Sequence, residues 1–374
     1  MTVYLDCNAT TPMSPEVSLI VGRYLMEEFG NAGSRTHEFG VIAKQAVEQA
    51  RQFVAEVVDA EKSEVIFTSG ATESNNLAIL GLKDYAEKIG KKHIITTRIE
   101  HKAVLEPIEE LVKQGFEVTY LNTDGSGIVS AKQLSASLRA DTFLVSIMHV
   151  NNETGSIQQI EDYCEVLSEH EAFFHVDAAQ SFGKLNLPLR NKRLDLISVS
   201  GHKFYAPKGV GALICRRRGF KKPPLKALMF GGGQEKGLRP GTLPVALIAG
   251  LGEAARQSIL NADERHKRCE VIKLNAIERL HELGAVINGA NTMPHVLNFS
   301  IPGLNSETAM VALKGLVAVS NGSACTSSSY TPSHVLTAMG LDEENIENAI
   351  RMSWCYMTKD IPWDQIIDKL KQYL

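Results

Sequence analysis

The chain lacks the features of disulfide-stapled, zinc-binding and membrane-embedded proteins. Its 374 residues include only six cysteines, at positions 7, 164, 215, 269, 325 and 355, and no two of them form a CxxC pair. Neither a disulfide framework nor a metal site is therefore indicated, and we expect reduced thiols in a cytoplasmic protein. No apolar run reaches the roughly 18 residues that span a bilayer, and no basic and apolar leader precedes Tyr4. We expect neither an export signal nor a membrane anchor.

Positive charge is not in excess either. The net charge of −4 excludes a broad basic surface for a nucleic-acid backbone, so no direct binding of nucleic acid is expected. Hydrophobic residues make up 44% of the chain and charged residues 22%, with no internal repeat or low-complexity tract. This composition is typical of a large soluble enzyme.

Short apolar runs alternate with amphipathic stretches from about residue 16 to 250. The runs, which we interpret as strands, are residues 64–67, 93–96, 143–147, 173–176 and 195–199. This alternation predicts an α/β fold with a mostly parallel or mixed sheet. Its ligand crevice should lie at the carboxyl ends of the strands.

The pattern changes near residue 250. Residues 244–283 are long and helical in character, and new strand candidates follow at residues 295–300 and 349–353. We therefore expect a large α/β domain over residues 16–250. A smaller α+β domain is expected to comprise residues 1–15 and 251–374.

A lysine follows the run at 195–199, within Ser200-Gly201-His202-Lys203. A partly desolvated amine at the mouth of the crevice can be nucleophilic toward an aldehyde cofactor, and Ser200 and His202 could face a phosphate. The alternative is an ordinary solvated surface lysine.

An aspartate ends the preceding run, within His175-Val176-Asp177, and Gln180 follows shortly after it. Asp177 could pair with a protonated pyridine nitrogen, and Gln180 could reach a hydroxyl on the same ring. The alternative for Asp177 is a helix N-cap ahead of Ala178.

The run at 64–67 leads into Thr68-Ser69-Gly70-Ala71-Thr72 and then a predicted helix. Backbone N–H groups at the helix start, such as that of Ala71, and the Thr72 hydroxyl would form an anion site suited to phosphate. Glycine at position 70 permits close approach of the backbone. Capping of the helix by Ser69 or Thr72 is the alternative.

Residues 320–330 are small and polar and should form an exposed, mobile loop around Cys325. An accessible thiolate there could attack a substrate sulfur. A packed, inert role suits Cys164, Cys215 and Cys269 better than Cys325.

Several motifs together carry a family resemblance. In chain order they are Leu5-Asp6, residues 9–12 (ATTP), 69–74 (SGATES), 100–102 (EHK), 151–155 (NNETG), 177–180 (DAAQ), 200–203 (SGHK), 239–242 (RPGT), 320–328 around Cys325, and 351–353 (RMS). In this order they resemble the cysteine desulfurases, which are pyridoxal-phosphate (PLP) enzymes of the aspartate aminotransferase-like fold type I. The likeness spans nearly the whole chain, and GSACTS at 322–327 looks like the long-loop class.

The resemblance implies an activity and roles for its matching residues. Sulfur would pass from L-cysteine to Cys325 as a persulfide, releasing L-alanine, and then to an acceptor protein. Lys203 would hold PLP, and His101 would stack on its ring and shuttle protons. Asn152 and Arg351 would hold the substrate carboxylate. Thr242 would reach the phosphate of the neighbouring subunit in a homodimer. From the residues alone, His101 could instead be a surface histidine at a helix start, and Arg351 half of a structural ion pair.

Two departures and two rival functions accompany the resemblance. Trp354-Cys355-Tyr356 stands where the family usually has a Leu-Gly-Arg-like run, and we interpret Cys355 as packing rather than a second thiol near the exit path. The chain ends at Leu374, so we expect no extended tail with which to engage a scaffold protein. The acceptor pathway could be iron-sulfur assembly, tRNA thiolation or DNA phosphorothioation.

An aminotransferase or selenocysteine lyase would share Lys203 and Asp177. A non-catalytic sulfur-pathway scaffold is the remaining alternative.

Overall fold

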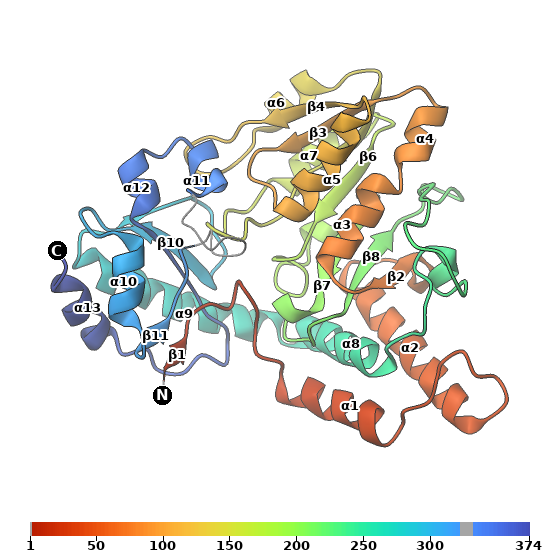
Figure 1. Cartoon of the computed structure of the whole chain (residues 1–374), viewed down its shortest axis with the longest axis horizontal. Coiled ribbons are helices and arrows are strands. Elements are labelled where there is room, and N and C mark those ends of the chain that lie inside the picture. Colours follow the sequence, from red (N-terminus) through yellow and green to blue (C-terminus); the bar gives the residue numbers. More distant parts are fainter. Residues whose placement is uncertain (1, 322–331) are drawn as a thin grey trace.

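A mixed seven-stranded sheet is the largest element of the computed structural model, which describes residues 2–321 and 332–374 (Figure 1). Strand β8 is antiparallel to both of its neighbours, and the other neighbouring strands pair in parallel. In spatial order the strands are β2 (Val65–Thr68), β8 (Gly211–Cys215), β7 (Leu196–Ser200), β6 (Phe173–Asp177), β5 (Thr142–Ser146), β3 (His93–Thr97) and β4 (Glu117–Leu121).

The five strands that the sequence predicts for this sheet are confirmed to within one residue at each end. Two further strands were not predicted. β4 mixes polar and apolar residues and is only partly buried, since it lies at an edge of the sheet. β8 begins with the weak strand formers Gly211 and Ala212. The α/β fold class is confirmed, and the sheet is the mixed one of the two expected forms.

Helices cover both faces of this sheet (Figure 1). Alternate residues of a strand point to opposite faces, so Phe67 joins one apolar core and Ile66 the other. One core packs against α1 (Pro15–Met26), α2 (Glu38–Val57), α6 (Ala131–Ser137), α7 (Ile160–Val166) and α8 (Val245–Leu260). The other packs against α3 (Ala71–Leu80), α4 (Lys83–Lys88) and α5 (Lys102–Lys113).

A third apolar core forms around a three-stranded antiparallel sheet in the order β12-β10-β9. Its strands are β12 (Ala349–Ser353), β10 (Val296–Ser300) and β9 (Val286–Ile287), and its helices are α9 (Ala262–His281), α10 (Ser306–Leu313) and α13 (Trp363–Lys371). The short strands β1 (Val3–Tyr4) and β11 (Val317–Ala318) pair in parallel beside it. Two short helices, α11 (His334–Ala338) and α12 (Glu343–Glu347), complete this part of the chain.

The helical stretch expected over residues 244–283 is two helices, α8 and α9, which meet at Asn261. Helix α8 passes through residue 250 while packing along α1 and α2, so a domain boundary at 250 stays a prediction, as does the one at 15. Among the helices of residues 2–321 and 332–374, none combines the length and the apolarity that crossing a bilayer requires.

Candidate active site

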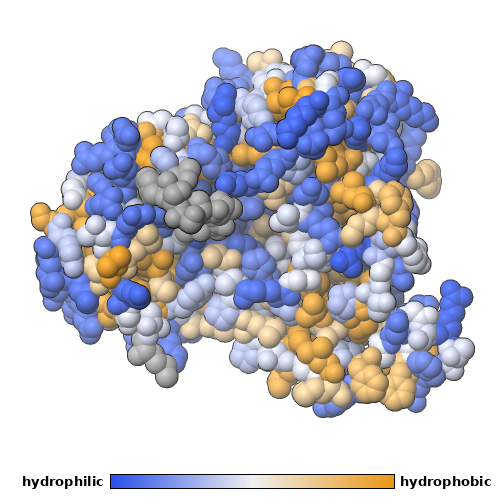
Figure 2. All heavy atoms as spheres, in the orientation of Figure 1, coloured by the Kyte–Doolittle hydropathy of each residue, from blue (hydrophilic) through white to orange (hydrophobic). Residues whose placement is uncertain are grey.

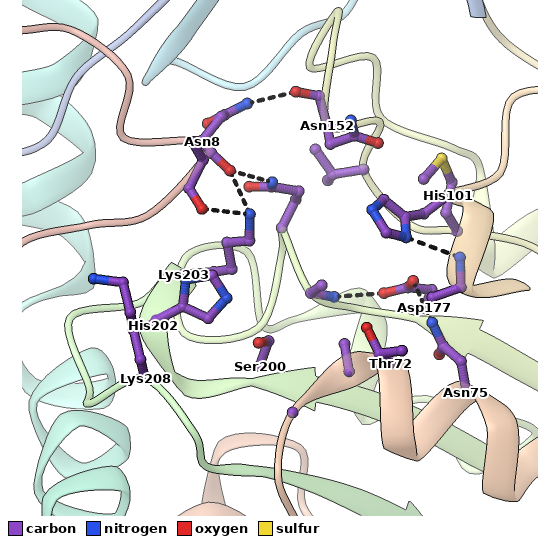
Figure 3. Close-up of a pocket in the computed structure, with 18 of the residues that line it drawn as sticks. Asn8, Thr72, Asn75, His101, Asn152, Asp177, Ser200, His202, Lys203 and Lys208 are labelled. Atoms are coloured by element: carbon purple, nitrogen blue, oxygen red, sulfur yellow. Dashed lines mark hydrogen bonds between the residues drawn. The ribbon is translucent and has the colours of Figure 1, made fainter. Parts of the chain in front are cut away.

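A cavity of about 480 Å³ opens at the carboxyl ends of the large sheet's strands (Figure 3). Strands β6 and β7 end at its floor, and the loop after β5 and the start of α3 form its walls. Ten of the residues singled out from the sequence line it: Ala71, Thr72, His101, Asn152, Asp177, Gln180, Ser200, His202, Lys203 and Arg351.

Lys203 lies in a short 3-10 turn (Gly201–Lys203) directly after β7. Its Nζ donates to the carbonyl oxygens of Asn8 at 2.6 Å and Ala9 at 2.9 Å, so the amine is held inside the cavity by the N-terminal segment (Figure 3). The alternative of a solvated surface lysine is wrong.

Asp177 ends β6 with only 5% of its surface exposed. Its Oδ2 accepts from Asn75 Nδ2 at 2.8 Å, and its Oδ1 accepts from the Ala179 N–H at 2.9 Å. The second contact is turn-like, but no helix begins at Ala178, so the N-cap alternative is wrong. Both donors are neutral, and the carboxylate lines the cavity.

The start of α3 faces the cavity without a side-chain cap. Its N-cap is Gly70 at φ 152°, a backbone region that favours glycine, and a Cβ there would lie 3.5 Å from Ser200 Oγ. The capping alternative for Ser69 and Thr72 is therefore wrong. The first N–H groups of a helix have no partner within the helix, so this end can accept an anion.

His101 is the N-cap of α5, and its Nδ1 accepts from the Ala103 N–H at 3.0 Å. It is thus a helix-start histidine that also lines the cavity. Because Nδ1 accepts, the proton of the neutral ring sits on Nε2. Burial lowers the pKa of His101; Asp177 opposes this shift, and Lys203 adds to it.

Arg351, in β12, is 3% exposed and makes two polar contacts at the cavity. Its Nη2 donates to Asp6 Oδ1 at 2.7 Å, and its Nη1 donates to the Asn152 carbonyl at 3.0 Å. The ion-pair interpretation is confirmed, yet the guanidinium also lines the cavity, and its buried Nε has no hydrogen-bond partner among the residues that the structure describes.

His202 and Gln180 contact the same N-terminal segment that holds Lys203. His202 Nδ1 lies 3.1 Å from Thr10 Oγ1, and burial with the neighbouring Lys203 lowers the pKa of His202 to about 4, which keeps the ring neutral. Gln180 Nε2 donates to the Asn8 carbonyl at 3.0 Å. The N-terminal segment therefore forms one wall of the site.

Other residues singled out from the sequence either do not line this cavity or are not described by the structure. Cys325 is outside the described residues, and Thr242 is exposed and does not line this cavity. Cys355 is buried against Cys7 and Tyr205, as the packing interpretation expects. Cys164, Cys215 and Cys269 are likewise buried.

Sequence reasoning missed Asn8, Asn75 and Lys208, which also line the cavity. Asn75 follows Thr72 by three positions on α3, so helical spacing could have placed both on one face. Asn8 gives no local signal, because its partner Lys203 is distant in the sequence.

The chain as a whole is similar to known proteins of one family. A family model described as aminotransferase class-V matches residues 3–361. The cysteine desulfurase IscS of Vibrio vulnificus (strain YJ016) is 44% identical over 376 residues, which cover 99% of this chain and 92% of the relative. Two solved structures are similar over most of the chain: a NifS-like protein and DndA from Streptomyces lividans.

The NifS-like structure superposes with a TM-score of 0.91 at 37% identity and covers 100% of this chain and 99% of its own. The DndA structure gives a TM-score of 0.83 at 47% identity, covering 93% of this chain and 98% of its own. The chain therefore belongs to the aminotransferase class-V family and, within it, to the cysteine desulfurases.

Proposed function

We propose that the protein removes sulfur from free L-cysteine, releases L-alanine and retains the sulfur as a persulfide on Cys325. The observation that carries this proposal is the cavity, which is lined by an amine, a carboxylate, an imidazole and a guanidinium from Lys203, Asp177, His101 and Arg351. Members of this family use PLP, and these are the groups that an aldehyde cofactor and an amino-acid substrate require.

The cavity's donor set fits PLP. The uncapped start of α3, at Ala71 and Thr72, together with Ser200 and His202, would hold the phosphate, and Lys203 would hold the aldehyde carbon. Asp177 would pair with the ring nitrogen, His101 would stack on the ring, and Gln180 would reach the ring hydroxyl. Buried Asn75 Oδ1 and Gln180 Oε1 have no hydrogen-bond partner among the described residues, which leaves polar capacity for a ligand.

Proton transfer and substrate binding would be carried out by different residues of the cavity. Bound PLP supplies an electron sink next to the substrate's α-carbon. Asp177 keeps the ring nitrogen's proton in place, and Lys203 takes the α-proton of L-cysteine and returns a proton to the product. Asn152 and Arg351 orient the substrate carboxylate.

Sulfur transfer falls to Cys325, which lies outside the described residues. Its thiolate attacks the substrate sulfur, a sulfur–sulfur bond forms, and the substrate's carbon–sulfur bond breaks. The electron pair of the broken bond stays with the three-carbon product, which gains protons and leaves as L-alanine. We propose a sulfur-acceptor protein of an iron-sulfur, tRNA-thiolation or DNA-phosphorothioation pathway as the next carrier.

We also propose that the protein is a homodimer in the cytoplasm. Apolar side chains gather over α1 and the start of α2, at the lower edge of the face in Figure 2. They include Leu19, Leu25, Met26, Phe29 and Phe39. Exposed apolar patches are typical of protein interfaces, and a partner subunit could bring Thr242 to the phosphate.

The five cysteines that the structure describes are unpaired thiols, which supports a reducing compartment.

A single-turnover experiment tests the proposal. PLP-loaded protein and its Cys325→Ala variant are mixed with L-cysteine, and alanine and protein-bound persulfide are quantified, with Cys164→Ala as a buried-thiol control. We expect both products from the unmutated protein and the control, and at least about a hundredfold loss in Cys325→Ala, the size expected when a nucleophile is removed. Alanine from Cys325→Ala would place the nucleophile elsewhere. No alanine from loaded, unmutated protein would contradict L-cysteine as the substrate.

A further inference from the structure

The described chain on each side of residues 322–331 is tied to the substrate side of the cavity. Before this segment, the Ser320 N–H donates to the Arg351 carbonyl at 3.2 Å, and the Arg351 N–H donates to the Ser320 carbonyl at 2.6 Å. After it, Ser333 Oγ donates to Glu153 Oε2 at 2.5 Å. Both anchors therefore meet residues at or next to the proposed carboxylate site, Arg351 and Asn152.

Glu153 is a buried carboxylate, 3% exposed, in the loop after β5. Its N–H donates to Asn151 Oδ1 at 2.8 Å, and Asn151 Nδ2 donates to the Ile99 carbonyl at 3.1 Å, so the loop itself is held firmly. Within residues 2–321 and 332–374, no lysine or arginine forms an ion pair with Glu153. A buried carboxylate is costly unless it is hydrogen-bonded, and the hydroxyl of Ser333 supplies that bond.

Ser333 also begins helix α11. Its Oγ accepts from the Leu336 N–H at 3.1 Å as the N-cap. In the next turn Val335 and Leu336 pack against Ile99 and Met148, and Met148 lines the cavity. His334 Nε2 lies 3.0 Å from the carbonyl of Glu100, the residue before His101. A shift of α11 would therefore be transmitted to the cavity wall.

We infer that Glu153 and Ser333 are positioning residues for sulfur transfer. Their hydrogen bond ties Ser333, eight residues after Cys325 in the chain, to the loop that bears Asn152. It thereby fixes the described end of the chain from which Cys325 must reach the substrate. Neither side chain touches a reacting atom. The inference rests on the proposed function, because it requires Cys325 to be the residue that receives sulfur.

The test compares Glu153→Ala, Ser333→Ala and their double variant, all loaded with PLP. The absorbance change on mixing with L-cysteine reports substrate capture, and the single-turnover rate of Cys325 persulfide reports transfer. We expect transfer to slow about tenfold in each single variant, the loss typical of a hydrogen bond to a charged group, while the absorbance change is kept. Glu153→Gln retains an acceptor oxygen and should recover most of the rate.

Ser130→Ala is the matched control for losing a serine N-cap. Ser130 Oγ caps α6 by accepting from the Gln133 N–H at 3.2 Å, away from the cavity, so this variant should keep the full rate. A double variant no slower than either single variant would support one shared interaction.

Other outcomes overturn the inference. Multiplying losses in the double variant would mean that the two residues act independently, and an equal loss of the absorbance change would assign them to substrate capture. Unchanged transfer in Ser333→Ala and Glu153→Ala would also contradict it. Unmutated protein that forms no persulfide on Cys325 would instead refute the proposed function, and this inference with it.

Discussion

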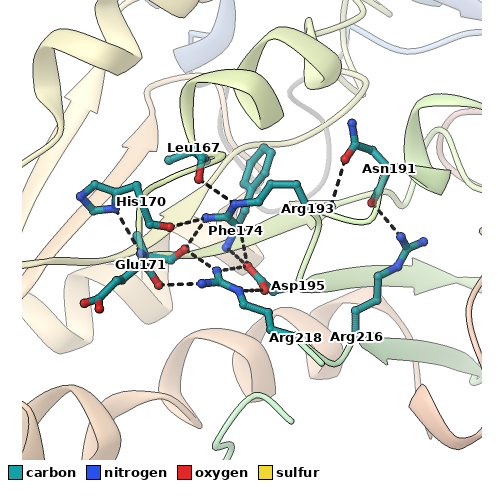
Figure 4. A network of polar contacts seen from close by, with 10 residues as sticks. Leu167, His170, Glu171, Phe174, Asn191, Arg193, Asp195, Arg216 and Arg218 are labelled. Atoms are coloured by element: carbon teal, nitrogen blue, oxygen red, sulfur yellow. Dashed lines mark hydrogen bonds and ion pairs between the residues drawn. The ribbon is translucent and has the colours of Figure 1, made fainter. Parts of the chain in front are cut away.

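Asp177 and Asp195 are both buried. Asp177 lies at the carboxyl edge of the large sheet, where its parallel strands end, and Asp195 lies at the amino edge, where they begin. Asp195, just before β7, accepts from Arg218 Nε at 2.6 Å and from Arg193 Nη1 and the Phe174 N–H, each at 2.7 Å (Figure 4). Among the described residues, Asp177 at the end of β6 accepts only from neutral groups of Asn75 and Ala179. The same residue type therefore pairs with protein cations at one end of the strands and faces a cavity at the other.

Other polar residues at the two ends of the strands also differ in what they bind. At the amino edge, Arg216 donates to the carbonyls of Leu189 at 2.8 Å and Asn191 at 2.7 Å, which ties loops to the end of β8. Four buried atoms of residues that line the cavity have no partner among the described residues: Asn8 Oδ1, Asn75 Oδ1, Gln180 Oε1 and Arg351 Nε. Arg216 Nε at the amino ends of the strands is also unpartnered there, so what distinguishes the ligand-binding end is that its unpartnered groups lie around a cavity.

The largest expected effect is on stability at the amino edge. Asp195→Asn leaves Arg193 and Arg218 without their carboxylate, and breaking such a buried pair costs about 3 kcal/mol or more of the free energy of unfolding. Urea unfolding monitored by circular dichroism measures this loss. Asp141→Asn, which disrupts an exposed pair with Arg139, should lower stability by less than about 1 kcal/mol.

Asp177→Asn should produce the opposite pattern. An amide keeps an acceptor oxygen for the Asn75 or Ala179 donor, so the free energy of unfolding should change by less than about 1 kcal/mol. Alanine production should fall about a hundredfold, because a neutral amide cannot hold the charge on a ring nitrogen. A urea midpoint lowered as far as in Asp195→Asn would break the comparison.

The smallest expected effect concerns Glu100, next to His101 at the carboxyl edge. Burial raises the pKa of Glu100 from 4.5 to about 8, so the folded protein keeps this proton where the unfolded chain loses it. Stability should therefore decline as the pH rises from about 4.5 towards 8. Glu100→Gln should abolish this decline, which urea unfolding at pH 5 and at pH 8 measures as the difference in the free energy of unfolding between the two pH values. Exposed Glu110→Gln should leave the decline in place.

Sequence patterns predicted the strands well, because β-branched and apolar runs between turn residues are a strong local signal. They also predicted that Asp177, Ser200 and Lys203 would share one edge, since the carboxyl ends of parallel strands meet there. The partners of these residues were not predictable. The carbonyl of Asn8 that holds Lys203, and Asp6 that pairs with Arg351, come from the other end of the chain. Only the folded topology brings them near.

The pairing of β1 has a consequence for how the protein folds. Val3 pairs with Val317, and Asp6 bridges Ser353, so both contacts join residues that are far apart in the sequence. Contacts this distant in sequence form slowly and late. Asn8 and Ala9 follow β1 closely in the chain, so the carbonyls that hold the Lys203 amine should settle only after these distant contacts have formed. Assembly of the reactive centre would then be one of the last events in the maturation of each new molecule.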